Sequence, residues 1–279
     1  MVTPALVLLA AGLGTRFGGP KQLVPVGPHD EPLFVLTARD AVAGGVGKLV
    51  IVTRRPLRER VEALAAIHLP GVPMEIVLQD IAEPVRPIPW GTAHAVAVCA
   101  SVLDGRFLVA NADDHYGDGV VASLAGRVAA LGPSEAIVVG YRLGGTLSAY
   151  GPVNRAECLV DDTGRVVAVR ERRGLRRRGG VIVDEAGRSV EAGTLVSMNL
   201  FALGRGVATM LGERFEAFSQ EHASDPTELV LPDELTALID AGRLTMRLVP
   251  TECGWRGLTY PEDLADLRLA VAGGAMPSD

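Results

Sequence analysis

The chain has 279 residues, of which 48% are hydrophobic, so it is long and apolar enough to bury a sizeable core. Its formal net charge of −6 argues against a nucleic-acid partner, because general nucleic-acid-binding proteins are usually basic. No apolar run approaches the roughly 18 residues of a membrane span, so we expect no membrane partner. Three widely separated cysteines without metal-ligand spacing favour a reduced, cytoplasmic location.

Strand-like and helix-like segments alternate through the first half of the chain, which is typical of βαβ units around a parallel sheet. Apolar runs predict strands at Val2–Leu9, Lys48–Thr53, Met74–Leu78, Arg106–Ala110 and Ala136–Tyr141. Helical periodicity predicts helices at Leu33–Ala43, Leu57–Ile67, Gly91–Leu103 and Val120–Leu131. Prolines between Asp80 and Trp90 predict a loop before the third of these helices.

The second half of the chain changes character, because short strands joined by turns replace the alternation. The predicted strands are Val153–Leu159, Val166–Val169, Val181–Val183, Ser189–Glu191, Thr194–Leu203 and Thr245–Pro250. The predicted helices are Val207–Gln220, Glu228–Ala241 and one from Pro261. We therefore expect an α/β fold with a mostly parallel sheet, helices on both faces and an antiparallel elaboration. One domain would span residues 1–272, followed by a disordered tail at 273–279.

A glycine-rich loop follows the first predicted strand, over Leu9–Leu23. Glycines let the backbone approach a ligand closely and point its N–H groups at it. Arg16 and Lys21 add two cations beside those amides. This combination of amides and cations suits a polyphosphate.

Three phosphate-binding loop patterns can be compared with this segment. A Walker A loop has a lysine after its second glycine, where this chain has Pro20. A dinucleotide-binding fingerprint has a third glycine where this chain has Phe17. The nucleotidyltransferase pattern, L-A-A-G-x-G-T-R followed by P-K, fits at every position from Leu9 to Lys21. The loop therefore favours nucleotidyl transfer.

Asp113 and Asp114 follow the predicted strand Arg106–Ala110, at the edge of the sheet where open α/β folds bind ligands. Hard carboxylate oxygens suit Mg²⁺, which is commonly held by one or two carboxylates together with substrate phosphates. An aspartate pair also serves as a helix cap or a turn, and that interpretation competes with the metal site. The phosphate loop upstream favours magnesium as the cofactor.

With these motifs in order, the chain resembles the sugar-phosphate nucleotidyltransferases, the NDP-sugar pyrophosphorylase-like NTP transferases. The resemblance implies a Rossmann-like, glycosyltransferase-A-like fold with a nucleotide-binding half at 1–145 and a sugar-phosphate-binding half at 146–272. Its further motifs are Gln79, Gly91-Thr92-Ala93-His94-Ala95, Asn111 to Gly117, Tyr150-Gly151, Glu171, Ser197-Met198-Asn199 and Trp255 to Leu264.

The resemblance also implies roles for single residues. The catalytic set would be Arg16, Lys21 and Asp113, and the metal ligands Asp113 and Asp114. The nucleotide would contact Leu9, Ala10, Ala11, Gly12, Gly14, Thr15, Gln79, Gly91 and Thr92. The sugar phosphate would contact Tyr150, Gly151, Glu171, Arg172 and Asn199. Within the run of six arginines from Arg170 to Arg178, Arg172 would replace the lysine that holds the phosphate, while Arg176 to Arg178 would lie on a surface loop.

The implied reaction joins a nucleoside triphosphate to a sugar-1-phosphate or a similar phosphomonoester and releases pyrophosphate. UTP, CTP and dTTP stay unranked, the acceptor can be a sugar or a cyclitol phosphate, and a homo-oligomer is left open. Two positions depart from the family pattern, the short bridge Phe17–Gly19 and Gly257, which stands where a second metal-binding aspartate is expected. The rival functions are a non-catalytic regulator on the same fold, which Gly257 favours, an NAD(P)-linked oxidoreductase and a nucleic-acid module.

Overall fold

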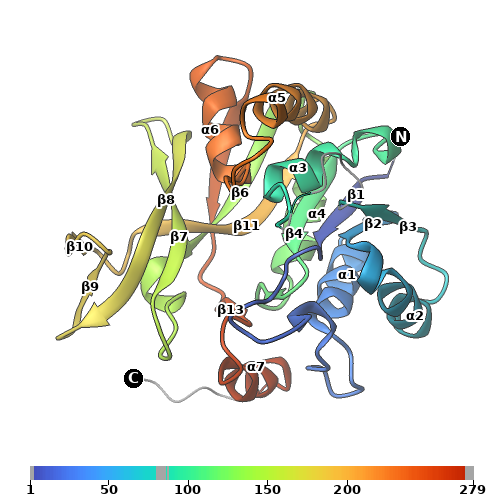
Figure 1. Ribbon diagram of the computed structural model, residues 1–279, viewed down its shortest axis with the longest axis horizontal. Coiled ribbons are helices and arrows are strands. Elements are labelled where there is room, and N and C mark those ends of the chain that lie inside the picture. The colour runs from blue at the N-terminus through green and yellow to red at the C-terminus, as the bar shows by residue number, and fades with distance from the viewer. Residues whose placement is uncertain (1–2, 80–85, 87, 274–279) are drawn as a thin grey trace.

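The first strand of the chain lies inside a parallel group of strands in a computed structural model that describes residues 3–79, 86 and 88–273 (Figure 1). β1 (Ala5–Leu9) pairs in parallel with β2 (Lys48–Thr53) on one side and with β4 (Phe107–Asn111) on the other. β3 (Met74–Leu78) extends the group beyond β2. In this register Leu9 lies beside Asn111, so the segments that follow β1 and β4 leave the sheet side by side.

The rest of this sheet is largely antiparallel. β11 (Leu195–Leu203) runs antiparallel between β4 and β6 (Glu135–Arg142), and β12 (Thr245–Pro250) pairs in parallel with β6. The other strands, joined by antiparallel pairings, are β7 (Val153–Val160), β8 (Arg165–Arg178), β9 (Val181–Val183) and β10 (Ser189–Val190). The sheet is therefore mixed, and the prediction of a mostly parallel sheet is wrong. Short turns such as 161–164 connect the strands of the second half, and turns of that length join only antiparallel strands.

Helices cover both faces of the central strands. Successive side chains of a strand point to opposite faces of the sheet, so each face has an apolar core of its own. Leu6 and Leu8 of β1 face one apolar cluster, whereas Ala5 and Val7 face the other. The first cluster includes residues of α1 (Leu33–Ala43), α2 (Arg58–His68) and α4 (Val120–Val128). The second includes residues of α3 (Thr92–Ala97), α5 (Val207–Glu221) and α6 (Leu231–Asp240). Figure 1 shows α1 and α2 on the side of the sheet opposite α5 and α6.

The C-terminal segment crosses the edge of the sheet where the strands β1 and β4 end. β13 (Arg256–Gly257) pairs antiparallel with β5 (Asp114–His115), directly after β4. α7 (Asp263–Val271) follows and packs on a small third cluster that contains Leu33, Leu258 and Leu267. The end of the chain is thereby brought onto the loops that leave β1 and β4.

Several predicted elements have the predicted bounds in the structure, including α1, β2, β3, β9 and β12. β8 is much longer than predicted, because it pairs with β7 up to Leu175 and with β9 through Arg176–Arg178. The prediction that Arg176 to Arg178 lie on a loop is therefore wrong. α3 ends at Ala97 and α6 begins only at Leu231, with Pro232 in its first turn, where proline is tolerated. Most of the predicted 80–90 loop and the tail from residue 274 lie outside the described residues.

Within the described ranges, none of the helices combines the length and apolar composition that a membrane crossing requires.

Candidate functional site

The glycine-rich loop leaves β1 with a row of backbone N–H donors for which the described residues supply no acceptor. The N–H groups of residues 11–16 donate no hydrogen bond to any described residue. The carbonyl of Gly14 instead accepts the N–H groups of Phe17 and Gly18, at 3.1 and 3.0 Å, and closes the loop into a tight turn. This arrangement can present successive amides to an anion.

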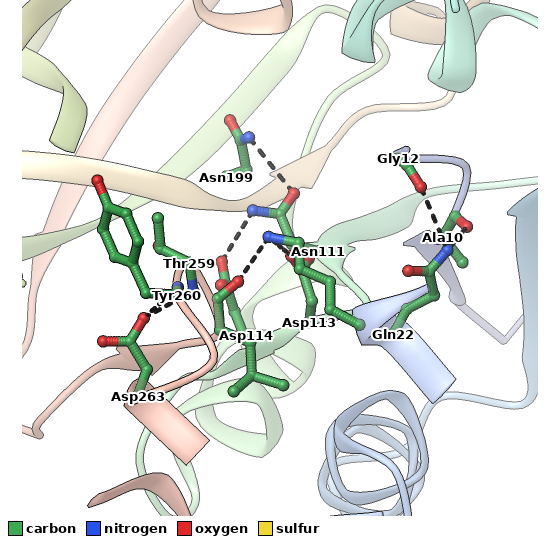
Figure 2. Close-up of polar contacts among 12 residues, drawn as sticks. Ala10, Gly12, Gln22, Asn111, Asp113, Asp114, Asn199, Thr259, Tyr260 and Asp263 are labelled. Carbon is green, nitrogen blue, oxygen red and sulfur yellow. Dashed lines mark hydrogen bonds and ion pairs between the residues drawn. The ribbon is translucent and has the colours of Figure 1, made fainter. Parts of the chain in front are cut away.

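Glycine and glutamine fix the shape of this loop. Gly14 has a φ of +64°, and a Cβ there would overlap the carbonyl oxygen of Gly19, so a larger residue would force the turn open. The buried side chain of Gln22 donates its Nε2 to the carbonyl oxygens of Ala10 and Gly12, at 2.8 and 3.4 Å (Figure 2). Gln22 is a supporting residue that the sequence pattern did not single out.

A cavity of about 470 Å³ opens beside the loop. It is lined by every residue that the sequence predicted for the nucleotide, namely Leu9, Ala10, Ala11, Gly12, Gly14, Thr15, Gln79, Gly91 and Thr92. The three predicted catalytic residues, Arg16, Lys21 and Asp113, line it as well. Residues from four separate stretches of the chain therefore meet around one cavity.

Gln79, which follows β3, and the start of α3 form one wall of this cavity. Gln79 is buried, and its Nε2 donates to the carbonyl oxygen of Gly91 at 2.7 Å, with His94 Nδ1 at 3.4 Å. Burial lowers the pKa of His94 to about 4, so its imidazole is neutral at pH 7. Gly91 has a φ of +106° and lies against Leu229, whose backbone nitrogen would be 2.7 Å from a Cβ. The amide orientation of Gln79 is thus set by groups around it.

The acidic segment after β4 contains two aspartates in different environments. Asp113 forms an ion pair with Lys21, and the ammonium of Lys21 also donates to the carbonyl oxygen of Leu258 at 2.6 Å. Asp114 is buried and accepts a hydrogen bond from Asn111 Nδ2 at 2.8 Å (Figure 2). Burial, together with the neighbouring Asp113 carboxylate, raises the pKa of Asp114 to about 7. Asp113 is therefore the more exposed carboxylate, and Asp114 belongs to the floor of the site.

The donor set fits a magnesium ion that is shared with substrate phosphates. No group of three or more histidine, cysteine or acidic side chains gathers within the described residues, which excludes an all-protein cage there. Asp113 lines the cavity beside the loop, and Mg²⁺ needs only one or two carboxylates when phosphates supply further oxygens. The predicted second ligand, Asp114, already accepts a hydrogen bond from Asn111.

A bulge in β11 brings Asn199 to the same place. The pairing of β11 with β6 shifts between Ser197 and Phe201, and Asn199 there adopts a φ of +60°. Its Nδ2 lies 3.4 Å from Asn111 Oδ1 (Figure 2). Bulges re-aim side chains in this way next to binding sites.

A second cavity, of about 400 Å³, adjoins the first on the side of β7, β8 and β11. Arg16, Lys21, Asp113 and Asn199 line both cavities, so the two meet at these side chains. Glu171 lines the second cavity and accepts a hydrogen bond from Asn154 Nδ2 at 2.9 Å. The placement of Glu171 and Asn199 at this cavity agrees with the predicted sugar-phosphate set.

Three predicted sugar-phosphate residues do not line either cavity. Tyr150 is 47% exposed, and Gly151 packs on the ring of Tyr260, whose Cζ would lie 2.8 Å from a Cβ. Arg172 lies beside the second cavity but is paired with Glu157 at 2.5 Å and with Asp184 at 3.6 Å. The strand register determines which of several arginines reaches the cavity, and a motif alignment does not contain that information.

Several lining residues had no role predicted from the sequence, although Trp255 and Thr259 belong to the Trp255 to Leu264 motif. They are mostly single polar or aromatic residues on the second-half strands and loops, Asn154, Arg155, Glu228, Trp255 and Thr259. Glu228 and Thr259 line both cavities. Burial raises the pKa of Glu228 above its ordinary value. Arg155 follows the predicted Tyr150-Gly151 motif by a few residues, which is the one sequence signal that could have pointed to it.

Comparison with known proteins agrees with this geometry. Residues 6–138 match the family described as the MobA-like NTP transferase domain. A Thermococcus kodakarensis protein named bifunctional IPC transferase and DIPP synthase is 26% identical over 177 residues, which cover 58% of this chain and 39% of that relative. The matched part is thus less than half the length of that protein.

Two solved structures share the fold over nearly the whole chain. The inositol-1-phosphate CTP transferase from T. maritima superimposes with a TM-score of 0.65 at 15% identity and covers 99% of both chains. HddC from Yersinia pseudotuberculosis has a TM-score of 0.61 at 14% identity and covers 96% of this chain and 99% of its own. Both likenesses confirm a mixed α/β nucleotidyltransferase-like fold. Residues 6–138, which contain the phosphate loop and the acidic segment, therefore match a nucleotidyltransferase domain family over just under half of the chain.

Proposed function

We propose that this enzyme joins a nucleoside triphosphate to a phosphomonoester, a sugar-1-phosphate or a cyclitol phosphate, and releases pyrophosphate. The observation that carries the proposal is the meeting of two cavities at Arg16, Lys21 and Asp113. A triphosphate in the first cavity and an acceptor in the second would bring their phosphates together at these charges. The residue roles predicted from the sequence are part of the same proposal, except that of Arg172, which pairs with Glu157 and Asp184 and lines neither cavity.

The chemistry needs positioning more than proton transfer. An oxygen of the acceptor phosphate attacks the α-phosphorus of the triphosphate, the bond to the bridging oxygen of the β-phosphate breaks, and pyrophosphate leaves. Phosphomonoesters have a second pKa near 6, so the attacking oxygen is already ionised at pH 7 and needs no general base. The protein then contributes alignment and charge neutralisation.

The loop amides and the two cations would each hold a different part of the triphosphate. The unpaired amides of residues 11–16, with Arg16, would hold the β- and γ-phosphates and the leaving pyrophosphate. Lys21 would neutralise the α-phosphate, and its bond to the Leu258 carbonyl fixes its ammonium near Asp113. Asp113, supported by Asp114, would hold Mg²⁺. The bound ion would neutralise charge on the phosphates.

Substrate specificity would depend on how the first cavity binds the base and how the second binds the acceptor. The first cavity would take the base beside Ala11 and Gln79, and we favour a pyrimidine, from UTP, CTP or dTTP. Glu171 and Glu228 would accept hydrogen bonds from acceptor hydroxyls in the second cavity. A related fold is an inositol-1-phosphate CTP transferase, so that substrate pair comes first in a test.

A panel assay tests the proposed function. The purified chain is incubated with Mg²⁺, each of the five common triphosphates and a set of phosphates that includes inositol 1-phosphate and glucose 1-phosphate, and released pyrophosphate is measured. We expect release only when both substrates are present, with one pyrimidine triphosphate preferred by at least about tenfold, which corresponds to one good base contact. Tight triphosphate binding without release by any pair would favour a regulator instead.

A further inference from the structure

Arg155 on β7 lines the second cavity. Its Nε donates to the carbonyl oxygen of Thr146 at 3.0 Å, Nη2 donates to the same oxygen, and Nη1 donates to the carbonyl oxygen of Asn154 at 2.7 Å. The guanidinium carbon lies 4.7 Å from the centre of the Trp255 ring. Backbone carbonyls and an aromatic face therefore hold this side chain in one orientation.

Arg155 has no carboxylate partner in the part of the chain that the structure describes, where no aspartate or glutamate oxygen lies within 4.0 Å of its nitrogens. The neighbouring arginine provides a contrast. Arg172 lies opposite Arg155 in the β7–β8 ladder and is neutralised by Glu157 and Asp184. A partly buried cation without a counter-charge is costly, and a binding site is where such a cost is commonly found.

The charged groups around Arg155 leave its guanidinium positively charged. Burial lowers the pKa of Arg155 to about 10, which Asp114 and Asp263 oppose and Arg16 reinforces, so the guanidinium stays charged at pH 7. Arg16 and Lys21 line the same cavity. An anion placed there would share the cavity with three cations and with the carboxyl groups of Asp113, which pairs with Lys21, and Asp114. Its hydroxyl-bearing part could face Glu171 and Glu228.

We propose that Arg155, and not Arg172, binds the phosphate group of the acceptor in the second cavity, an inference that rests on the proposed function. A guanidinium has five N–H donors, and the backbone takes three of those of Arg155. One donor remains on Nη1 and one on Nη2, the pair that grips a phosphate in the bidentate manner. Trp255 and Thr146 keep that fork in place.

Matched lysine substitutions on the two facing arginines test the assignment. Arg155→Lys keeps the charge and most of the stem but removes the fork, and Arg172→Lys is the control. With the best substrate pair, we expect Arg155→Lys to raise the KM for the acceptor about 10- to 100-fold, the range for a lost charged hydrogen bond. The KM for the triphosphate should stay within about twofold, and Arg172→Lys should leave both constants within about twofold. An acceptor KM that rises in Arg172→Lys and not in Arg155→Lys would overturn the assignment.

Direct binding separates this inference from the proposed reaction. Calorimetric titration with inositol 1-phosphate and glucose 1-phosphate, against free inositol and free glucose, needs no turnover. We expect the wild-type protein to bind at least one of the phosphates and neither free polyol. Arg155→Met, which keeps the stem over Trp255 without charge, should lose that binding, and circular dichroism melting reports whether it is folded.

The outcomes are distinct for the two proposals. Phosphate binding that depends on Arg155, without pyrophosphate release by any substrate pair, would refute the proposed reaction and support the anion site. Pyrophosphate release with phosphate binding that is equal in wild type, Arg155→Lys and a folded Arg155→Met would support the reaction and refute the role of Arg155. Absence of phosphate binding to the wild-type protein would also refute it.

Discussion

Gly257 pairs with Asp114 across the short β13–β5 ladder, at the position where the family pattern led us to expect a second metal-binding aspartate. A Cβ at Gly257 would overlap the ring of Trp255 and lie 2.6 Å from Asp114 Oδ1. The glycine therefore leaves room for the ring of Trp255, which packs beside Arg155. This packing gives Gly257 a structural role at the position where an aspartate was expected.

A substitution at Gly257 tests this packing argument. We expect Gly257→Ala to lower the free energy of unfolding by about 1–3 kcal/mol, the usual cost of an overpacked site, as measured by urea denaturation. Gly254→Ala is the control, because a Cβ there would meet only Arg256 Nη1, at 3.7 Å, and we expect a change within about 0.5 kcal/mol. Equal stability of the two variants would contradict the account of Gly257.

The residues of the loop motif lie together at the first cavity because the constraints that place them are local. The turn at Gly14 and the cations Arg16 and Lys21 follow from residues a few positions apart, and all three line the first cavity. Arg172 lines neither cavity because it pairs with Glu157 on β7 and with Asp184 directly after β9, and pairs between such distant residues cannot be predicted from one sequence. Arg155 was missed for the same reason.

At the level of elements, the long strand β8 shows that a run of charged residues can form a strand. The sequence around Arg170 to Arg178 contains few apolar residues, so the predicted strand ended at Val169 and Arg176 to Arg178 were predicted to lie on a surface loop. The strand continues because β7 and β9 supply hydrogen-bonding partners as far as Arg178, and Leu175 is the buried residue that anchors it. Edge pairing, which is a long-range property, overrode local propensity here.

The bulge in β11 is the second element with a direct role in the site. Asn199 holds a φ of +60°, a conformation that asparagine tolerates better than alanine does and that glycine adopts without strain. We expect Asn199→Ala to be less stable than Asn199→Gly by about 1 kcal/mol in urea denaturation, since the left-handed backbone costs an L-residue about 1–2 kcal/mol.

The same pair of variants separates the backbone from the amide. Both remove the Asn199 side chain, which lies 3.4 Å from Asn111 and lines both cavities. Both variants should therefore raise the KM for the acceptor to a similar degree. Stabilities that do not differ, or an acceptor KM unchanged in both, would show that the bulge does not position a binding residue.

Across the whole molecule, the sheet joins two differently built halves. The parallel strands β1 to β4 carry most of the first cavity at their carboxyl ends, as βαβ alternation predicted. The antiparallel strands β7, β8 and β11 carry the second cavity. This arrangement supports the proposed division into a nucleotide-binding half at 1–145 and an acceptor-binding half at 146–272. The cytoplasmic location and the oligomeric state stay as predictions.

The central claim is that Lys21 and its neighbours at the junction of the two cavities transfer a nucleotidyl group. The most direct measurement is the turnover number for pyrophosphate release, with the best substrate pair, for wild type, Lys21→Ala and the control Lys48→Ala. Lys48 pairs with Glu75 and lines neither cavity. We predict a loss of about 10²–10³-fold for Lys21→Ala, the effect of removing one charge-stabilising donor, and near-normal turnover for Lys48→Ala. Near-normal turnover in folded Lys21→Ala would contradict the account.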